Sequence, residues 1–175
     1  RMLLLDSLRV ALDRDEFELV YLPIFRAGGR PIAVEALLRW RHPEKGLIPP
    51  GMFVPLAEEI GLIVPIGEWV VREACATAAR WPGAPKGAVN MSSAQFSDTA
   101  LVATVMDALA ASGLAPDRLE LEITETNLLQ NSAATLSALH QLRDIGVRIA
   151  MDDFGTGYSS LSYFQSFPFD KIKID

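Results

Sequence analysis

The sequence predicts an α/β fold built on a mainly parallel sheet, and three observations support this. Helical and strand-like patterns alternate along the 175 residues, which is typical of parallel strands joined by crossover helices. Half of the residues are hydrophobic and 22% are charged, so the chain can bury a sizeable core. The loop at residues 25–31 is shorter than the dozen or so residues of a parallel crossover, so the two strands that it joins are predicted to be antiparallel.

Each element is predicted from its hydrophobic period and its boundary residues. An amphipathic pattern predicts a first helix at residues 3–12, and later helices are expected at 53–60, 66–81, about 99–112 and 132–145. Gly113 and Gly146 are expected to stop the last two helices. Strands are expected at residues 17–24, 32–40, 88–91, 119–124, 147–152 and 171–175, which makes about six.

Composition limits the function and the compartment. The net charge of -6 argues against a DNA or RNA groove, which is normally basic, but it allows a nucleotide ligand if metal ions carry the compensating charge. Cys75 is the only cysteine, so we expect a buried thiol and a reducing, cytoplasmic compartment. The most apolar stretch, residues 61–71, is too short to span a membrane. Because the chain opens at Arg1 and stops inside a strand-like run, we expect it to be part of a longer protein.

Carboxylate and amide side chains lie at the ends of five predicted strands. They are Glu35, Asn90, Glu122, the pair Asp152 and Asp153, and Asp175, with the cations Arg39 and Lys173 among them. Since residues two apart on a strand share a face, Glu35 and Arg39 reach the same space. The sequential Asp152 and Asp153 can serve one pocket only if the strand ends there and the backbone turns.

Acidic side chains that converge repel one another, at a cost of about 4 kcal/mol for two charges about 4 Å apart at an effective dielectric near 20. Protons, a cation such as Lys173 or divalent metals must offset this repulsion. Oxygen ligands together with Asn90 suit Mg²⁺ or Mn²⁺. Two such ions about 3.5 to 4 Å apart polarise a phosphate and activate a bridging water. We therefore expect a metal site that handles phosphate.

Five motifs, in this order and spacing, resemble the EAL domain family. They are EALLRWRHP from Glu35, VNMS around Asn90, LEITET around Glu122, DDFGTGYSSL from Asp152 and FDKIKID at the end. Members of this family are bacterial phosphodiesterases that cut cyclic di-GMP to linear pGpG in a modified TIM barrel. The resemblance implies one EAL domain over residues 1–175, truncated on its C-terminal side, with the closing strands, an EGVE-type glutamate and a later glutamine beyond Asp175.

The resemblance also implies roles for single residues. Glu35, Asn90, Glu122 and Asp152 are similar to the ligands of a first metal, and Asp152 and Asp153 to those of a second. Lys173 resembles the lysine that orients the nucleophilic water, so the catalytic set is expected to be Glu35, Lys173, Asp152 and Asp153. Arg39 is expected to grip a substrate phosphate above Leu37, Glu125 to hold the loop after Asp153, and Asp175 to add a polar contact. That loop and residues 159–164 are where the family points to a homodimer.

Simpler interpretations of the same residues stay open. Glu35 and Arg39 fit a structural ion pair, residues 152–157 a polar turn, Glu125 a helix cap, and Lys173 a side chain that extends to solvent. The family commonly carries Gln where this chain has Leu22, which removes a polar contact to the ligand. The predicted function is metal-dependent hydrolysis of cyclic di-GMP, and the alternative is a non-catalytic cyclic di-GMP receptor that signals through loop or dimer changes.

Overall fold

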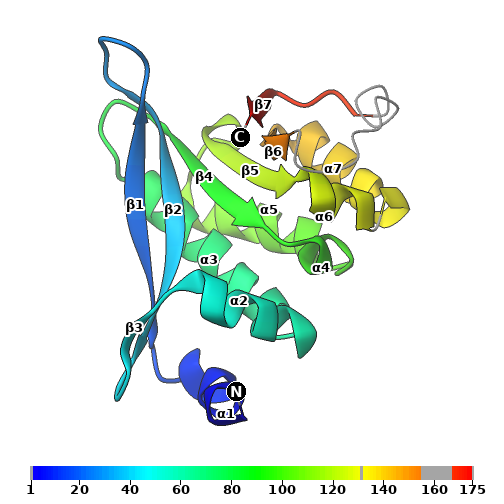
Figure 1. Ribbon diagram of the computed structural model, residues 1–175. Helices are drawn as coiled ribbons and strands as arrows, with labels where there is room; N and C mark the ends of the chain where they lie inside the picture. The colour runs from blue at the N-terminus through cyan, green and yellow to red at the C-terminus, as the bar shows by residue number, and fades with distance from the viewer. Residues whose placement is uncertain (1, 131, 155–166, 175) are drawn as a thin grey trace.

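One mixed sheet organises the chain (Figure 1). A computed structural model describes residues 2–130, 132–154 and 167–174, and within them the strand order is β1-β2-β4-β5-β6-β7, with β3 attached to β2. The strands are β1 (Phe17–Phe25), β2 (Pro31–His42), β3 (Gly46–Ile48), β4 (Lys86–Met91), β5 (Leu119–Thr124), β6 (Arg148–Phe154) and β7 (Lys171–Ile174). β2 pairs antiparallel with β1 and with β3, whereas the pairs β2–β4, β4–β5, β5–β6 and β6–β7 are parallel. The predicted fold class is confirmed, and the sheet is open between β1 and β7 in the described residues.

The predicted helices are all present, with ends that shift by a few residues. The helices are α1 (Met2–Ala11), α2 (Pro50–Glu59), α3 (Ile63–Ala78), α4 (Ser93–Phe96), α5 (Leu101–Ser112), α6 (Glu125–Gln130) and α7 (Ser132–Ile145). α2 begins at Pro50 because a fixed φ and a missing N–H suit the first helical turn. α5 ends at Gly113 in the left-handed conformation, as predicted. Within the described ranges, no helix combines the length and the apolar character needed to cross a bilayer.

Two features differ from the sequence-based prediction. β3, α4 and α6 were not predicted, because three to six residues are too few to show a hydrophobic period. The prediction that β6 ends at Asp152 is wrong, since the strand continues to Phe154. An irregular pairing with β7 accompanies this extension.

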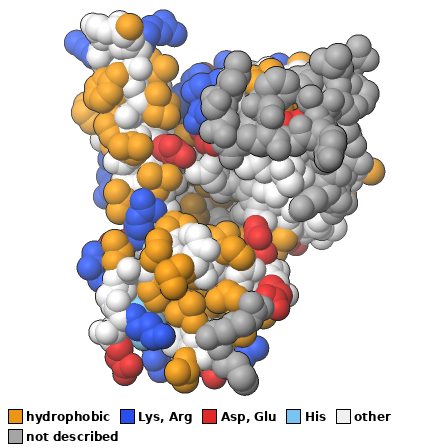
Figure 2. All heavy atoms as spheres, in the orientation of Figure 1, with side chains coloured by type: hydrophobic (Ala, Val, Ile, Leu, Met, Phe, Trp, Pro, Cys, Tyr) orange, Lys and Arg blue, Asp and Glu red, His pale blue; other side chains and the backbone are white. Residues whose placement is uncertain are grey.

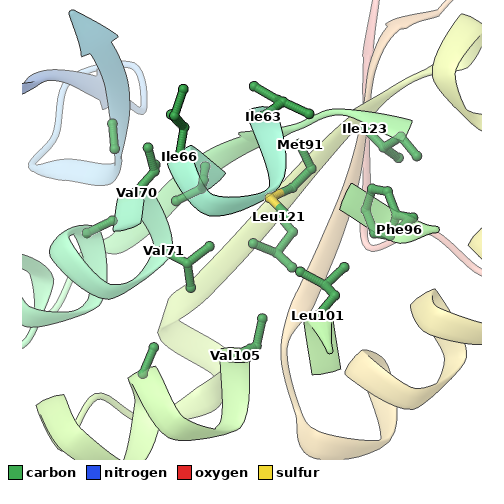
Figure 3. Close-up of a cluster of buried hydrophobic side chains, with 14 of the residues drawn as sticks. Ile63, Ile66, Val70, Val71, Met91, Phe96, Leu101, Val105, Leu121 and Ile123 are labelled. Atoms are coloured by element: carbon green, nitrogen blue, oxygen red, sulfur yellow. The ribbon is translucent and has the colours of Figure 1, made fainter. Parts of the chain in front are cut away.

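The hydrophobic core lies between the sheet and the helices α3 and α5 (Figure 3). Leu121 and Ile123 of β5 share this core with Val70 and Val71 of α3 and Val105 of α5, and all five are buried. Burying a side chain of this size contributes about 1.5 to 3 kcal/mol. The apolar face of β5 thus packs under helices as predicted, and the glutamates of β5 occupy the opposite face.

Candidate functional site

Three of the predicted metal ligands meet on neighbouring strands. Parallel pairing sets Asn90 of β4 directly beside Glu122 of β5. The amide Nδ2 of Asn90 donates a hydrogen bond to Oε1 of Glu35 on β2, at 3.0 Å. Arg39 instead donates to the carbonyl oxygen of Leu38, at 2.8 Å. The partner of Glu35 is therefore the amide of Asn90, and the three oxygen-bearing side chains form one cluster.

Lys173 of β7 completes the cluster from the other side. Its Nζ forms a hydrogen bond and ion pair with Oε1 of Glu122, so the side chain points to the acid and not into solvent. Glu122 is only 1% exposed, and its Oε2 has no hydrogen-bond partner among the described residues. A buried carboxylate oxygen without a donor is a strong acceptor for a cation.

The charges of this cluster act on one another. Desolvation raises the pKa of Glu122, and the charges of Glu35 and Asp152 raise it further, which outweighs the opposing contact with Lys173. Desolvation lowers the pKa of Lys173, but the hydrogen bond and charge of Glu122, with Glu35 and Asp152, raise it overall. Four groups from β2, β5, β6 and β7 are thus coupled electrostatically.

Consecutive aspartates share one level of the sheet because β6 contains a bulge. Met151 pairs with Ile172 and Phe154 pairs with Ile174, so Asp152 and Asp153 together lie opposite Lys173. Two residues opposing one is the geometry of a β-bulge, which re-aims side chains. This explains how the strand continues where it was predicted to end. Asp175, the side chain of Asp153 and the segment at residues 155–166, which contains the expected dimer contacts, lie outside the described residues.

A cavity of about 290 Å³ adjoins the cluster. It opens where β2 leaves β4, because the pairing of these strands stops at Ala36 and Val89. Its walls include Leu37 and Arg39 on one side and Asn90 and Glu122 on the other. Figure 2 shows this face of the molecule hollowed at its centre. Two of the expected metal ligands, Asn90 and Glu122, therefore line the same space as the residues expected to bind substrate.

The turn that follows Asn90 is held by residues that the sequence analysis missed. Ser92 caps α4, accepting from the backbone N–H of Ala94 at 3.3 Å, and its own N–H donates to Oε1 of Gln95 at 2.8 Å. The Ser92 hydroxyl also donates to Oε1 of Glu58 at 2.8 Å, on the cavity wall. The S-x-x-Q spacing of a capping box could have revealed this turn.

Glu125 lies beyond the carboxyl end of β5, as the first residue of α6, and is 3% exposed. The helix is capped by the preceding residue, since the N–H of Asn127 donates to Oγ1 of Thr124 at 3.1 Å. Thr124 thus supplies one cap of α6, and both interpretations of Glu125 stay predictions. Its expected partner, the loop after Asp153, is outside the described residues.

The donor set fits a hard divalent cation in its chemistry. Carboxylate and amide oxygens are the preferred ligands of Mg²⁺ and Mn²⁺, and the orphaned Oε2 of Glu122 is available. Within the residues that the structure describes, no three His, Cys, Asp or Glu side chains are close enough to hold an ion by themselves. Asn90 lies between Glu35 and Glu122 and adds an amide oxygen to the ligand set.

Acidic side chains at the carboxyl ends of parallel strands are typical of TIM-barrel-like proteins, which bind their ligands at this edge of the sheet. The EAL domain family model matches residues 5–175, and the chain belongs to this family. MucR of Pseudomonas aeruginosa, named as a bifunctional diguanylate cyclase/cyclic di-GMP phosphodiesterase, is 48% identical over 177 residues, covering 98% of this chain and 26% of MucR. The chain spans between 21% and 28% of the length of eight curated relatives that it matches.

Solved structures show the same fold. The complex named as PaMucR phosphodiesterase with c-di-GMP has a TM-score of 0.93 and 48% identity, covering 99% of this chain and 72% of that chain. A Klebsiella pneumoniae BlrP1 structure, named as a calcium and cyclic di-GMP complex, has a TM-score of 0.78 and 33% identity, covering 94% of this chain and 41% of that chain. The TIM-barrel-like likeness expected from the sequence is confirmed.

Proposed function

We propose that this chain is part of a metal-dependent phosphodiesterase that hydrolyses cyclic di-GMP to linear pGpG. The observation that carries the proposal is the convergence of Glu35, Asn90 and Glu122 with Lys173 beside a cavity. Family membership and relatives named as cyclic di-GMP phosphodiesterases support the choice of substrate. The BlrP1 structure is named as a complex with calcium and cyclic di-GMP, which supports a divalent cation at such a site.

The residues divide between binding and chemistry. Arg39 on the cavity wall would hold a phosphate of the dinucleotide, and Leu37 beside it would form the apolar floor. Glu35, Asn90, Glu122 and Asp152 would hold a first cation, and Asp152 and Asp153 at the bulge would help to hold a second. Asp175 would add a polar contact, and Glu125 would hold the loop that follows Asp153.

Lys173 would act at the phosphate that reacts. When bound, Mg²⁺ or Mn²⁺ supplies Lewis-acid polarisation of the phosphate and lowers the pKa of a coordinated water. The ammonium of Lys173, which stays protonated because its pKa is raised, would orient that water and offset the negative charge that grows on the phosphate oxygens. The water oxygen would form a new bond to phosphorus, one P–O ester bond of the ring would break, and the released sugar oxygen would take up a proton to give linear pGpG.

Product analysis tests the proposal. The full-length protein is incubated with cyclic di-GMP and Mg²⁺ or Mn²⁺, and pGpG is the expected product. EDTA and the substitution Lys173→Met are each expected to abolish turnover, and Lys173→Met is expected to retain divalent cation binding because it removes a competing positive charge. Recovery of intact cyclic di-GMP from folded protein with either metal would refute the phosphodiesterase assignment.

The second candidate function is a cyclic di-GMP receptor without turnover. The observation that favours it is Leu22, which pairs directly with Glu35 and is 54% exposed, so an apolar side chain adjoins the acidic cluster. A receptor would bind cyclic di-GMP equally well with and without Mg²⁺ and would return it uncut. Calorimetry in both conditions, combined with product analysis, separates the two functions.

We also propose that residues 1–175 form an incomplete EAL domain of a larger cytoplasmic signalling protein. The span of 26% of MucR supports a longer parent, and the buried Cys75 supports a reducing compartment. A homodimer through the loop after Asp153 remains a proposal, which light scattering of the full-length protein tests directly.

A further inference from the structure

Two ion pairs cross the same strand. Glu120 and Glu122 of β5 pair with Lys171 and Lys173 of β7, and the first pair has an Nζ to Oε2 distance of 3.8 Å. β6 lies between β5 and β7 in the sheet. Since adjacent strands are about 4.8 Å apart, the lysine and glutamate of each pair must together span about 10 Å across the face of β6.

The strand pairing identifies the residue that they pass. Ala150 of β6 pairs with Glu122 on one side and with Lys171 on the other, so the three side chains share a face. Lys171 nevertheless pairs with Glu120, two residues before Glu122 along β5, so its side chain crosses on the amino-terminal side of Ala150. Lys173, two residues after Lys171, pairs with Glu122 and crosses on the other side. The two ion pairs therefore bracket Ala150.

The charges of both buried glutamates are compensated by the ion pairs that cross β6. Glu120 is 2% exposed and Glu122 is 1% exposed, and breaking a buried ion pair by removing one partner is strongly destabilising. Ala150 is itself fully buried. A longer side chain at this position would occupy the space through which the lysines reach.

We infer that Ala150 is a positioning residue, whose small side chain lets Lys171 and Lys173 cross β6 and so sets where the ammonium of Lys173 stands. It touches no substrate and acts only through the lysines. The catalytic part of this inference rests on the proposed phosphodiesterase function, whereas the steric part does not.

Chemical labelling tests the steric part without metal or substrate. The full-length protein and its variants Ala150→Ser, Ala150→Val and Ala150→Leu are labelled competitively with an amine reagent, and Lys171 and Lys173 are quantified by mass spectrometry. Labelling of both lysines is expected to rise about tenfold in the Val and Leu variants, because their ammonium groups would be released from the buried carboxylates of Glu120 and Glu122. A smaller rise is expected for Ser.

Ala88 provides the matched control. It is fully buried and lies on the same face of the sheet, paired with Glu35 and Glu120, but no ion pair of the described residues crosses β4. Ala88→Val is therefore expected to leave the labelling of both lysines unchanged. Labelling as slow in Ala150→Val as in the wild type, or an equal rise in Ala88→Val, would overturn the inference. If the larger variants do not fold, labelling of Ala150→Ser is the test. Labelling of Lys171 and Lys173 in that variant at the wild-type rate would also overturn the inference.

Kinetics test the catalytic part. In Ala150→Val, kcat for cyclic di-GMP is expected to fall about 100-fold with little change in KM, because a displacement of about 1 Å in a catalytic group has an effect of this size. A wild-type protein without turnover would refute the proposed function, and the labelling would still decide the steric part. Increased labelling with normal kcat would show that Ala150 does not position Lys173 for catalysis.

Discussion

The side chain of Gln95 lies directly over Gly67 of α3. A Cβ added to Gly67 would stand 1.8 Å from Nε2 of Gln95, which is far inside van der Waals contact. Gln95 is buried and holds the N–H of Ser92, two residues after Asn90. Because Gly67 has no side chain, Gln95 has room to hold the turn that follows Asn90.

Gly67→Ala is therefore expected to displace Gln95 and to destabilise the protein by about 1 to 3 kcal/mol, the usual cost of overpacking a core. Urea unfolding measures the change. Gly51→Ala is the control, since Gly51 lies in α2 with open space around it, and alanine is favoured over glycine in a helix by up to about 1 kcal/mol. Equal stability of the two variants would show that Gln95 relocates without cost.

Binding of Mn²⁺ is expected to depend on pH through Glu122. Its raised pKa means that the carboxyl takes up a proton at a higher pH than the 4.5 of an ordinary glutamate, so affinity should begin to fall above that value as the pH is lowered. In the metal-free protein, protonation of Glu122 has the opposite effect, because it stabilises the folded state. The stability contributed by protonated Glu122 is present below pH 4.5 and is lost as the pH rises through the raised pKa.

Calorimetry with Mn²⁺ over a pH series checks this dependence on Glu122. Glu122→Gln should weaken binding and remove this part of the pH dependence, whereas Glu44→Gln, in an exposed turn, should change neither. An unchanged pH dependence in Glu122→Gln would assign the titration to another group.

Leu22→Gln is expected to tighten cyclic di-GMP binding. Residue 22 stands directly opposite Glu35, and a polar side chain there would add one hydrogen bond, about 1 kcal/mol or roughly fivefold in affinity. Val20→Gln is the matched control, because residue 20 is also exposed and pairs with Leu37 on the same face. Titration calorimetry compares the two, and equal affinities would argue against a special role for position 22.

Alkaline unfolding should report on Cys75. Burial raises the pKa of this thiol from 9.0 to about 11, so above pH 9.0 the unfolded chain ionises first and the folded state loses relative stability until about pH 11. Two pKa units correspond to about 3 kcal/mol at most. Between pH 9.0 and about pH 11, the free energy of unfolding is therefore expected to fall by up to about 3 kcal/mol more in the wild type than in Cys75→Ala. Parallel stability curves would mean that the thiol stays neutral in both states.

The sequence predicts most of the regular elements because their hydrophobic residues recur at the period of a strand or a helix. β5 and α7 have the predicted bounds, and the short first loop correctly predicts the antiparallel pair. The bulge at Asp152 was not predicted, because strand register depends on the partner strand β7. The contact between Lys173 and Glu122, 51 residues apart in sequence, required the three-dimensional strand order. The roles of the predicted site residues stay predictions.

The early departure of β2 from β4 has a mechanical consequence. Beyond Ala36, in the described part of the chain, β2 forms strand pairs only with β1, as a two-stranded ribbon, and with the short strand β3, whereas Glu122 and Lys173 lie within the parallel strands. Arg39 thus lies on the ribbon, whereas Glu122 and Lys173 lie within the parallel strands. Bending of the ribbon would change the distance between the two groups without breaking a single hydrogen bond of the parallel strands.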